Sequence, residues 1–249
     1  MTTNNHLHFL SDIGREKFTS QDSDSQCPFC NREALSDILD EEDPIILVKN
    51  KYPTLANTFQ TVLIETNDCS ANMTTYESSH MQRIITFGIN HWIEMEKSGK
   101  FKSVVFYKNH GPLSGGTINH AHMQIVGLKN IDYKLNLRDD IFDGIEICQE
   151  GNCVLNISTK PNACATEFNI MTTPRNDQFM ADNIQKIVKY ILNQCGSFNL
   201  FFYQWKKSTI CKIMPRYVTS PFLVGYSIPQ TSSRLNQIVE EIQKTCRDY

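Results

Sequence analysis

The stretch NHGPLSGGTINHAHMQ contains two histidines separated by one residue, and a glutamine follows at the same spacing. Residues 120–128 are expected to form a strand, in which side chains alternate between two faces. His120, His122 and Gln124 would then share one face. Three polar groups on one face of an otherwise apolar strand cost burial free energy unless they are used. The pattern therefore predicts that this face binds a polar ligand.

The loop before this strand is rich in glycine and hydroxyl residues. Glycine allows the backbone of such a loop to approach a ligand closely, and successive N–H groups can form a concave site for an anion. A phosphate bound there would lie beside the histidine pair. The loop residues concerned are Gly111, Ser114, Gly115, Gly116 and Thr117.

A second motif whose residues could take part in chemistry is the sequence CPFC, in which Cys27 and Cys30 are separated by two residues. This spacing is typical of a zinc knuckle, but it also occurs in redox motifs and by chance in pairs of buried thiols. A redox motif normally follows a strand and begins a helix. A polar loop precedes this pair, so we favour metal binding over redox chemistry.

The elements that position these motifs can be read from hydrophobic periodicity. A segment with apolar residues near a 3.6-residue period predicts a long helix, and Gly99 is placed to end it. The two strands on either side of the glycine loop are expected to pair in an antiparallel manner. The order strand, strand, long helix, strand, strand predicts an antiparallel sheet with a helix on one face, which is an α+β fold. The expected strands are 44–50, 58–66, 102–109 and 120–128, and the expected helices are 32–39 and 74–99.

The second half of the chain repeats part of this plan without the histidine motif. Its expected strands are 167–173, 198–204 and 209–217, and its expected helices are 177–195 and 232–244. We therefore predict two fused, related halves, at 1–135 and 136–249, of which the second is degenerate. Its basic residues Lys212 and Arg216 would line an acceptor pocket or, as the simpler interpretation, lie on an exposed face.

Composition limits the class of protein. The chain has 249 residues, a formal net charge of −3 and nine cysteines. A slightly acidic chain lacks the basic surface that non-specific nucleic-acid binding needs. The odd number of scattered cysteines and the absence of a secretory signal disfavour a disulfide framework. No segment reaches the length of a membrane span, so we expect a cytoplasmic protein.

Asn109-x-Gly111, followed by a loop of small residues and by Asn119-His120-x-His122-x-Gln124, resembles the signature of galactose-1-phosphate uridylyltransferase. Its relatives in the histidine-triad-like (HIT-like) superfamily include the diadenosine tetraphosphate phosphorylases. The segments VKNKYPTL, IETNDCSANM and, more weakly, DIGREK are also similar to this group. The resemblance covers most of residues 12–128 and, more loosely, the second half. The short length indicates a smaller bacterial branch.

The resemblance implies a covalent mechanism. His122 would attack the α-phosphorus of a nucleotide and form a nucleotidyl-imidazole. The carbonyl of His120 would hold the other ring nitrogen of His122 as N–H. Gln124 would donate to a phosphate oxygen, and Ser114 and Thr117 would hold the leaving phosphate. The remaining substrate-binding residues would be Asn50, Tyr52, Asn109, Gly115 and Gly116.

The resemblance also implies a structural Zn²⁺. The corresponding ligands in this chain would be Cys27, Cys30, Cys69 and His120. Cys69 stands where the uridylyltransferase pattern has a histidine. A thiolate in place of an imidazole is a conservative change for zinc. Such a site would fix His120 and, through it, His122.

Three function classes remain open at this stage. The first is a nucleotidyltransferase acting on a nucleotide sugar or a nucleoside polyphosphate, with a phosphorylase or hydrolase of dinucleoside polyphosphates as a close variant. Gln124 favours transfer, because the hydrolases of the superfamily carry a third histidine at this position. The second is a catalytically weak nucleotide-binding zinc protein, and the third is a zinc-stabilised interaction protein. Both a monomer and a homodimer are compatible with the sequence.

Overall fold

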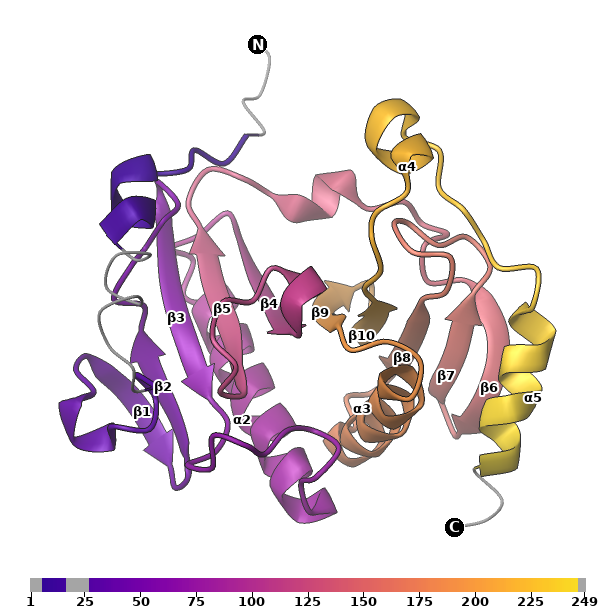
Figure 1. Cartoon of the computed structure of the whole chain (residues 1–249), viewed down its shortest axis with the longest axis horizontal. Coiled ribbons are helices and arrows are strands. Elements are labelled where there is room, and N and C mark those ends of the chain that lie inside the picture. The colour runs from indigo at the N-terminus through magenta and orange to yellow at the C-terminus, as the bar shows by residue number, and fades with distance from the viewer. Residues whose placement is uncertain (1–5, 17–26, 246–249) are drawn as a thin grey trace. The chain divides into compact units, whose positions relative to one another are not determined.

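The computed structural model describes residues 6–16 and 27–245, which form the expected α+β fold with two halves (Figure 1). Contacts group these residues into two units. The first unit comprises the described residues up to Ala71, together with Phe87–Phe106 and Ile118–Asn136. The second comprises Asn72–Thr86, Tyr107–Thr117 and the chain from Leu137. The unit boundary therefore crosses the chain several times, and the predicted division at residues 135 and 136 stays a prediction.

The first unit contains five strands in the order β1-β2-β3-β5-β4. The pairs β1/β2, β2/β3 and β3/β5 are antiparallel. In β3 and β5, Ile64 lies opposite His122 and Val62 lies opposite Gln124. His122 and Gln124 are thus the first and third residues of a strand that is paired on both sides, with β3 and β4. The strands are β1 (Ile38–Glu42), β2 (Ile45–Lys49), β3 (Thr58–Ile64), β4 (Ser103–His110) and β5 (His122–Leu128).

The long helix α2 (Ser78–Lys97) contributes its C-terminal half to the core of the first unit. Trp92 is fully buried, and its Nε1 donates to the carbonyl oxygen of Val104 at 2.9 Å. Gly88 allows the Phe106 ring close to the helix, because a Cβ at this glycine would lie 2.5 Å from Phe106 Cζ. Helix and sheet thus pack tightly behind β4.

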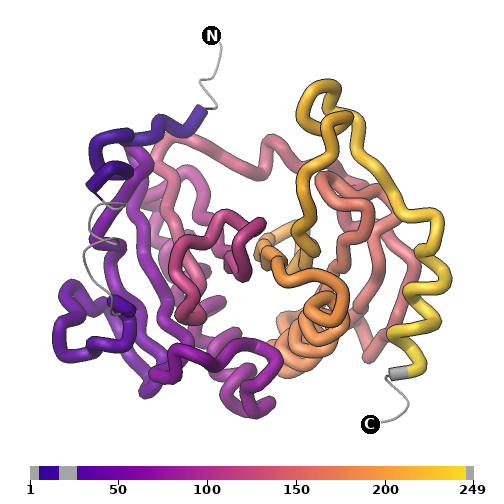
Figure 2. The backbone as a smooth tube through the Cα atoms, viewed as in Figure 1, coloured from indigo at the N-terminus to yellow at the C-terminus, as the bar shows by residue number. Residues whose placement is uncertain are grey.

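The second unit has five strands in the order β9-β10-β8-β7-β6. Helix α3 (Asp177–Leu192) packs on β8 and β10, and helix α5 (Leu235–Thr245) packs on β6. The backbone path in Figure 2 shows how the chain leaves the short helix α4 (Pro221–Tyr226) and runs to α5 beside β6. The strands are β6 (Gly144–Glu150), β7 (Cys153–Ser158), β8 (Phe168–Thr172), β9 (Phe198–Trp205) and β10 (Ser208–Pro215).

Several sequence-based expectations need correction. The predicted helix over residues 32–39 is wrong, because only Arg32–Ala34 forms a short 3₁₀ turn. Asp37 adopts a positive φ of 55°, which ends any helix there, and β1 follows. Strands β6 and β7 and helix α4 had no counterpart in the prediction. The described residues form three 3₁₀ turns, η1 (Arg32–Ala34), η2 (Pro112–Ser114) and η3 (Tyr133–Asn136).

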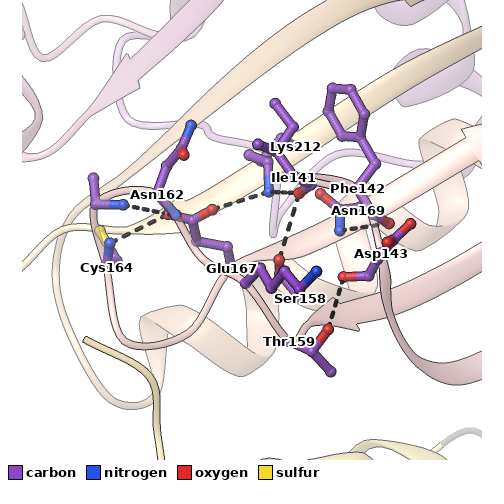
Figure 3. A network of polar contacts seen from close by, with 12 residues as sticks. Ile141, Phe142, Asp143, Ser158, Thr159, Asn162, Cys164, Glu167, Asn169 and Lys212 are labelled. Carbon is purple, nitrogen blue, oxygen red and sulfur yellow. Dashed lines mark hydrogen bonds and ion pairs between the residues drawn. The ribbon is translucent and has the colours of Figure 1, made fainter. Parts of the chain in front are cut away.

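The exposed position considered for Lys212 is also wrong, since this residue forms a buried ion pair with Glu167 (Figure 3). Nζ of Lys212 lies 2.9 Å from Oε2 of Glu167 and donates to the carbonyl oxygen of Ile141 at 2.9 Å. Burial lowers the pKa of Lys212, which the carboxylate partly opposes. The other carboxylate oxygen, Oε1, accepts backbone N–H groups from Asn162, Ala163 and Cys164. The pair therefore joins two loops to β10.

Replacement of Glu167 by glutamine is expected to lower the free energy of unfolding by about 3–5 kcal/mol, because it leaves a buried ammonium unpaired. The difference in unfolding free energy between the variant and the wild type should become smaller as the pH rises from 7 to 9. A lysine whose folded pKa lies below its unfolded value binds fewer protons when folded, so stability rises with pH. Denaturant unfolding at several pH values measures both effects.

The double variant Glu167→Gln/Lys212→Met provides the control. It removes both charges, so it is expected to be clearly more stable than Glu167→Gln alone. A double variant as unstable as the single one would mean that the loop hydrogen bonds, rather than the ion pair, dominate.

Candidate active site and metal centre

Three cysteines and one histidine of the first unit form a cluster. Their ligand atoms, from Cys27, Cys30, Cys69 and His120, all lie within 4.8 Å of one another. Nδ1 of His120 lies 3.5 Å from Sγ of Cys27 and 3.5 Å from Sγ of Cys30. Zinc–sulfur and zinc–nitrogen bonds of about 2.3 and 2.0 Å at a tetrahedral angle would separate sulfur and nitrogen by about 3.5 Å. The two distances from His120 thus fit a tetrahedral zinc ion, and all four predicted ligands lie close enough together to hold a metal ion.

The hydrogen bonds of His120 fit the same ion. Nε2 lies 2.8 Å from the carbonyl oxygen of Thr66, which can only accept, so Nε2 carries the proton. Nδ1 then directs its lone pair toward the thiols. A carbonyl that orients a metal-binding histidine in this way is common around zinc. Thr66 is a residue that the sequence did not indicate.

Two thiols of the cluster, those of Cys69 and Cys30, are harder to ionise than an ordinary thiol. Desolvation, followed by hydrogen bonds with the thiols of Cys30 and Cys27, raises the pKa of Cys69 to about 12. Desolvation also raises the pKa of Cys30. Because a metal ion binds the thiolate form, its charge would offset this cost and its binding would release protons.

The backbone carbonyl of His120, the histidine of the cysteine cluster, orients the side chain of His122. Its Nδ1 donates to the carbonyl oxygen of His120 at 2.8 Å. The carbonyl accepts only, so the neutral ring has the proton on Nδ1 and the lone pair on Nε2. The residue is 8% exposed. A neutral imidazole held in this tautomer has the form that a nucleophile requires.

Phe29, between the two cysteines of the CPFC motif, packs against both histidines. Its ring centroid lies 5.8 Å from that of His120 and 5.3 Å from that of His122, in edge-to-face geometry. It also belongs to a buried cluster with Val48 and Ile64 of the sheet. The cysteine motif is therefore anchored to the sheet by its aromatic residue, which the sequence analysis did not single out.

The predicted phosphate loop contains the 3₁₀ turn η2 between two glycines with positive φ, a backbone conformation that favours glycine. Gly111 has φ 79° and Gly115 has φ 86°. The Ser114 hydroxyl donates to the carbonyl oxygen of Gly111 at 2.7 Å and accepts from the N–H of Gly116 at 3.3 Å. Ser114 thus shapes the loop, and a direct contact between this hydroxyl and a phosphate stays a prediction.

The remaining loop residues are more open. Gly115 and Thr117 are exposed, and Gly116 is half-buried. Within residues 6–16 and 27–245, no acceptor is hydrogen-bonded to the N–H of Gly115 or of Thr117. These two N–H groups are the donors that an anion at this loop would meet.

The other predicted binding residues have local structural roles. The side-chain oxygen of Asn50 accepts from the N–H of Tyr52 at 2.9 Å, which stabilises the turn after β2. Nζ of Lys51 lies 5.5 Å from the ring centroid of half-buried Tyr52. Gln124 is half-buried on β5, two residues after His122 and on the same face. Contacts of Asn50, Tyr52 and Gln124 with a nucleotide stay predictions.

A surface hollow of about 630 Å³ lies elsewhere in the second unit, around the N-terminus of α3. Arg175 lines it, but its guanidinium forms an ion pair with Asp177. None of the predicted site residues line this hollow.

Of the cysteines outside the cluster, all described ones are free thiols, and Cys246 lies outside the described residues. None of the described helices is both long and apolar enough to cross a membrane.

Comparison with known structures supports the fold resemblance. A uridylyltransferase structure is 14% identical, with a TM-score of 0.69, and the alignment covers 90% of this chain and 92% of that chain. An ADP-glucose phosphorylase from Arabidopsis thaliana with bound ADP-glucose is 14% identical, with a TM-score of 0.69 and coverage of 88% and 89%. The HIT-like fold expected from the sequence is confirmed.

A much closer relationship links the chain to one protein family. A DUF4931 family protein from Bacillus cereus ATCC 10987 is 45% identical, with a TM-score of 0.76, over 84% of this chain and 98% of that chain. None of the curated proteins compared with this chain matches it. Residues 9–131 match the N-terminal domain, and residues 134–246 the C-terminal domain, of the family described as a domain of unknown function (DUF4931). The chain therefore belongs to the DUF4931 family.

Proposed function

We propose that this protein is a nucleotidyltransferase that forms a covalent nucleotidyl-histidine at His122 and acts on a nucleotide sugar or a nucleoside polyphosphate. The observation that carries the proposal is the 2.8 Å hydrogen bond from Nδ1 of His122 to the carbonyl oxygen of His120. It selects the tautomer whose Nε2 can attack phosphorus. The structural similarity to a uridylyltransferase and to an ADP-glucose phosphorylase supports a nucleotide as the substrate.

The first step forms a bond between Nε2 of His122 and the α-phosphorus. The phosphorus–oxygen bond to the leaving group breaks, and its electron pair leaves on the oxygen of a sugar phosphate or polyphosphate. Positive charge develops on the imidazole, and the carbonyl of His120 stabilises it through the Nδ1 hydrogen bond. In the second step an acceptor oxygen attacks phosphorus and the nitrogen–phosphorus bond breaks.

The surrounding polar groups would stabilise the charge on phosphate. Gln124, on the same face of β5 as His122, would donate its amide to a non-bridging oxygen. The N–H groups of Gly115 and Thr117, with the side chain of Asn109, would bind the leaving phosphate. Asn50 and Tyr52 would contact the base or ribose. Donors that are already oriented need little reorganisation when charge develops.

A Zn²⁺ ion held by Cys27, Cys30, Cys69 and His120 would have a structural role. The distances in the cluster and the proton on Nε2 of His120 both fit such an ion. The four protein ligands complete a tetrahedral shell, which is typical of structural rather than catalytic zinc. Bound zinc would fix His120, whose carbonyl orients the nucleophile.

Covalent labelling tests the proposed function. The protein is incubated separately with ADP-glucose, UDP-glucose and diadenosine tetraphosphate, each labelled at the α-phosphorus, and is then denatured. We expect protein-bound label that is stable in base and lost in acid, as a phosphorus–nitrogen bond requires. Binding without label from any of the three would instead favour a nucleotide-binding protein that does not form this intermediate.

The acceptor is identified in a second stage with the labelled protein. Release of label by a sugar phosphate would assign a transferase, release by inorganic phosphate a phosphorylase, and release by water alone a hydrolase. Gln124 leads us to expect that water releases the label at least tenfold more slowly than the true acceptor.

A further inference from the structure

The second half of the chain contributes a buried asparagine to the predicted phosphate loop. Asn199 on β9 is 1% exposed, and its Nδ2 donates to Oδ1 of Asn109 at 2.7 Å. The same nitrogen lies 3.1 Å from the carbonyl oxygen of Ser114 and 3.3 Å from that of Lys108. All three acceptors belong to residues 107–117. One side chain of the degenerate half therefore contacts this segment on both sides of Gly111.

The orientation of Asn199 follows from its other partner. Nη1 of Arg216 donates to Oδ1 of Asn199 at 3.0 Å. A guanidinium has only donors, so Asn199 must direct its oxygen to Arg216 and its nitrogen to Asn109. Asn109 must then direct its own oxygen to Asn199. Arg216 thus determines, through Asn199, the orientation of the Asn109 amide. Oδ1 of Asn109 faces Asn199, and Nδ2 of Asn109 faces away from it.

Nδ2 of Asn109 lies next to the glycines of the loop. A Cβ at Gly115 would be 3.9 Å from this nitrogen, and a Cβ at Gly116 would be 3.3 Å from Cβ of Asn109. In the described part of the chain, no acceptor is hydrogen-bonded to Nδ2 of Asn109. Nδ2 of Asn109 is therefore a third donor that a phosphate at this loop could meet, in addition to the N–H groups of Gly115 and Thr117.

Residues 196–198, at the start of β9, also contact the loop segment, at His110, Gly111 and Leu113. A Cβ at Gly111 would lie 2.0 Å from the carbonyl oxygen of Gly196, so only glycine allows this approach. The hydroxyl of Ser197 accepts from the N–H of Leu113 at 3.2 Å. The ring of His110 stacks on Phe198, with centroids 4.7 Å apart. The loop is thus held in one position, and the amide of Asn109 is held in one orientation.

We propose that Asn199 and Arg216 are positioning residues that keep the donor side of Asn109 toward a phosphate bound at the loop. The inference rests on the proposed function in one respect, namely that this loop takes a phosphate. A rotated Asn109 would present its carbonyl oxygen to the anion and repel it. The positive charge of Arg216 also polarises the Asn199 amide, which strengthens its hydrogen bond to Asn109.

Asn199→Asp reverses the chain of donors and is the most direct variant. The carboxylate can pair with Arg216, but it only accepts, so Asn109 is expected to turn Nδ2 toward it. Affinity for inorganic pyrophosphate should fall at least tenfold, as expected when a hydrogen bond to a charged group is lost. Asn199→Ala, which removes the constraint without reversing it, should lower the affinity less. Thermal unfolding confirms that each variant is folded.

A double variant separates positioning from a general structural effect. Asn109→Ala should weaken pyrophosphate binding, and adding Asn199→Asp to it should change the affinity less than twofold, because no amide remains to be oriented. Fully additive losses would overturn the inference.

A measurement on the unaltered protein keeps the test independent of folding. Titration with inorganic pyrophosphate should shift the side-chain NH₂ resonances of Asn109 in a ¹⁵N–¹H correlation spectrum. Unshifted resonances would overturn the inference, even if His122 is labelled by nucleotides. Shifted resonances without labelling of His122 would support the inference and count against the proposed function, so the two failures are distinguishable.

Discussion

Replacement of His122 by alanine is expected to abolish covalent labelling by every nucleotide that labels the wild type. The variant lacks the only atom proposed to bond to phosphorus, so the rate of label incorporation should fall by at least about 10³-fold. Nucleotide affinity should change much less, because the loop and Gln124 remain. Mass spectrometry of the intact protein measures the label, and calorimetric titration measures the affinity.

The zinc content of this variant is an equally informative measurement. His122 lies outside the cysteine cluster, so the variant should retain the metal content of the wild type. Loss of metal would mean that the roles of His120 and His122 are reversed. His91→Gln is a suitable control, since half-buried His91 of the first unit pairs with exposed Asp40 rather than with the cluster, and the variant should label normally.

The second large effect concerns the cysteine cluster. Cys30→Ser is expected to lower zinc affinity by more than about 100-fold, since changes to groups that merely orient a ligand already cost 10–100-fold. The midpoint of thermal unfolding should fall as well, because zinc binding contributes to folding free energy. Elemental analysis of the purified protein and differential scanning calorimetry, with and without added zinc, measure the two effects.

Cys69→Ser tests the ligand that departs from the uridylyltransferase pattern. It should reduce the zinc content in the same way, and full retention would remove Cys69 from the ligand set. Cys148→Ser serves as the matched control. Its thiol contacts Asn183 in the second unit rather than the cluster, so zinc content should be unchanged.

The fold was predictable where side-chain periodicity was strong. The long helix and the four main strands of the first half agree with the prediction to within a few residues, because the helix has apolar residues near a 3.6-residue period and strands such as β2 are short apolar runs. Strands β6 and β7 were missed, although Gly151 and Asn152 form a two-residue turn of a type that often joins hairpin strands. Polar and apolar residues in β6 alternate too weakly to show a strand.

The residues of the candidate site also fall into two groups, those that the sequence indicates and those that only the structure reveals. The motifs around Cys27 and His120 have short, fixed spacings, so the sequence alone could indicate their chemistry. Asn199 and Phe29 could not be found from spacing. Asn199 follows the histidine motif at a long distance in the chain, and Phe29 acts through packing. Such contacts depend on strand order, which local patterns do not determine.

The assignment of residues 107–117 to the second unit has a consequence for any attempt to divide this protein into fragments. A fragment that ends at the midpoint of the chain would retain the proposed nucleophile, His122, and the cysteine cluster. It would lack Asn199, Arg216 and the turn at Gly196, which hold the glycine loop. The proposed activity should therefore require both fragments together, and duplication of the first half could not replace the second.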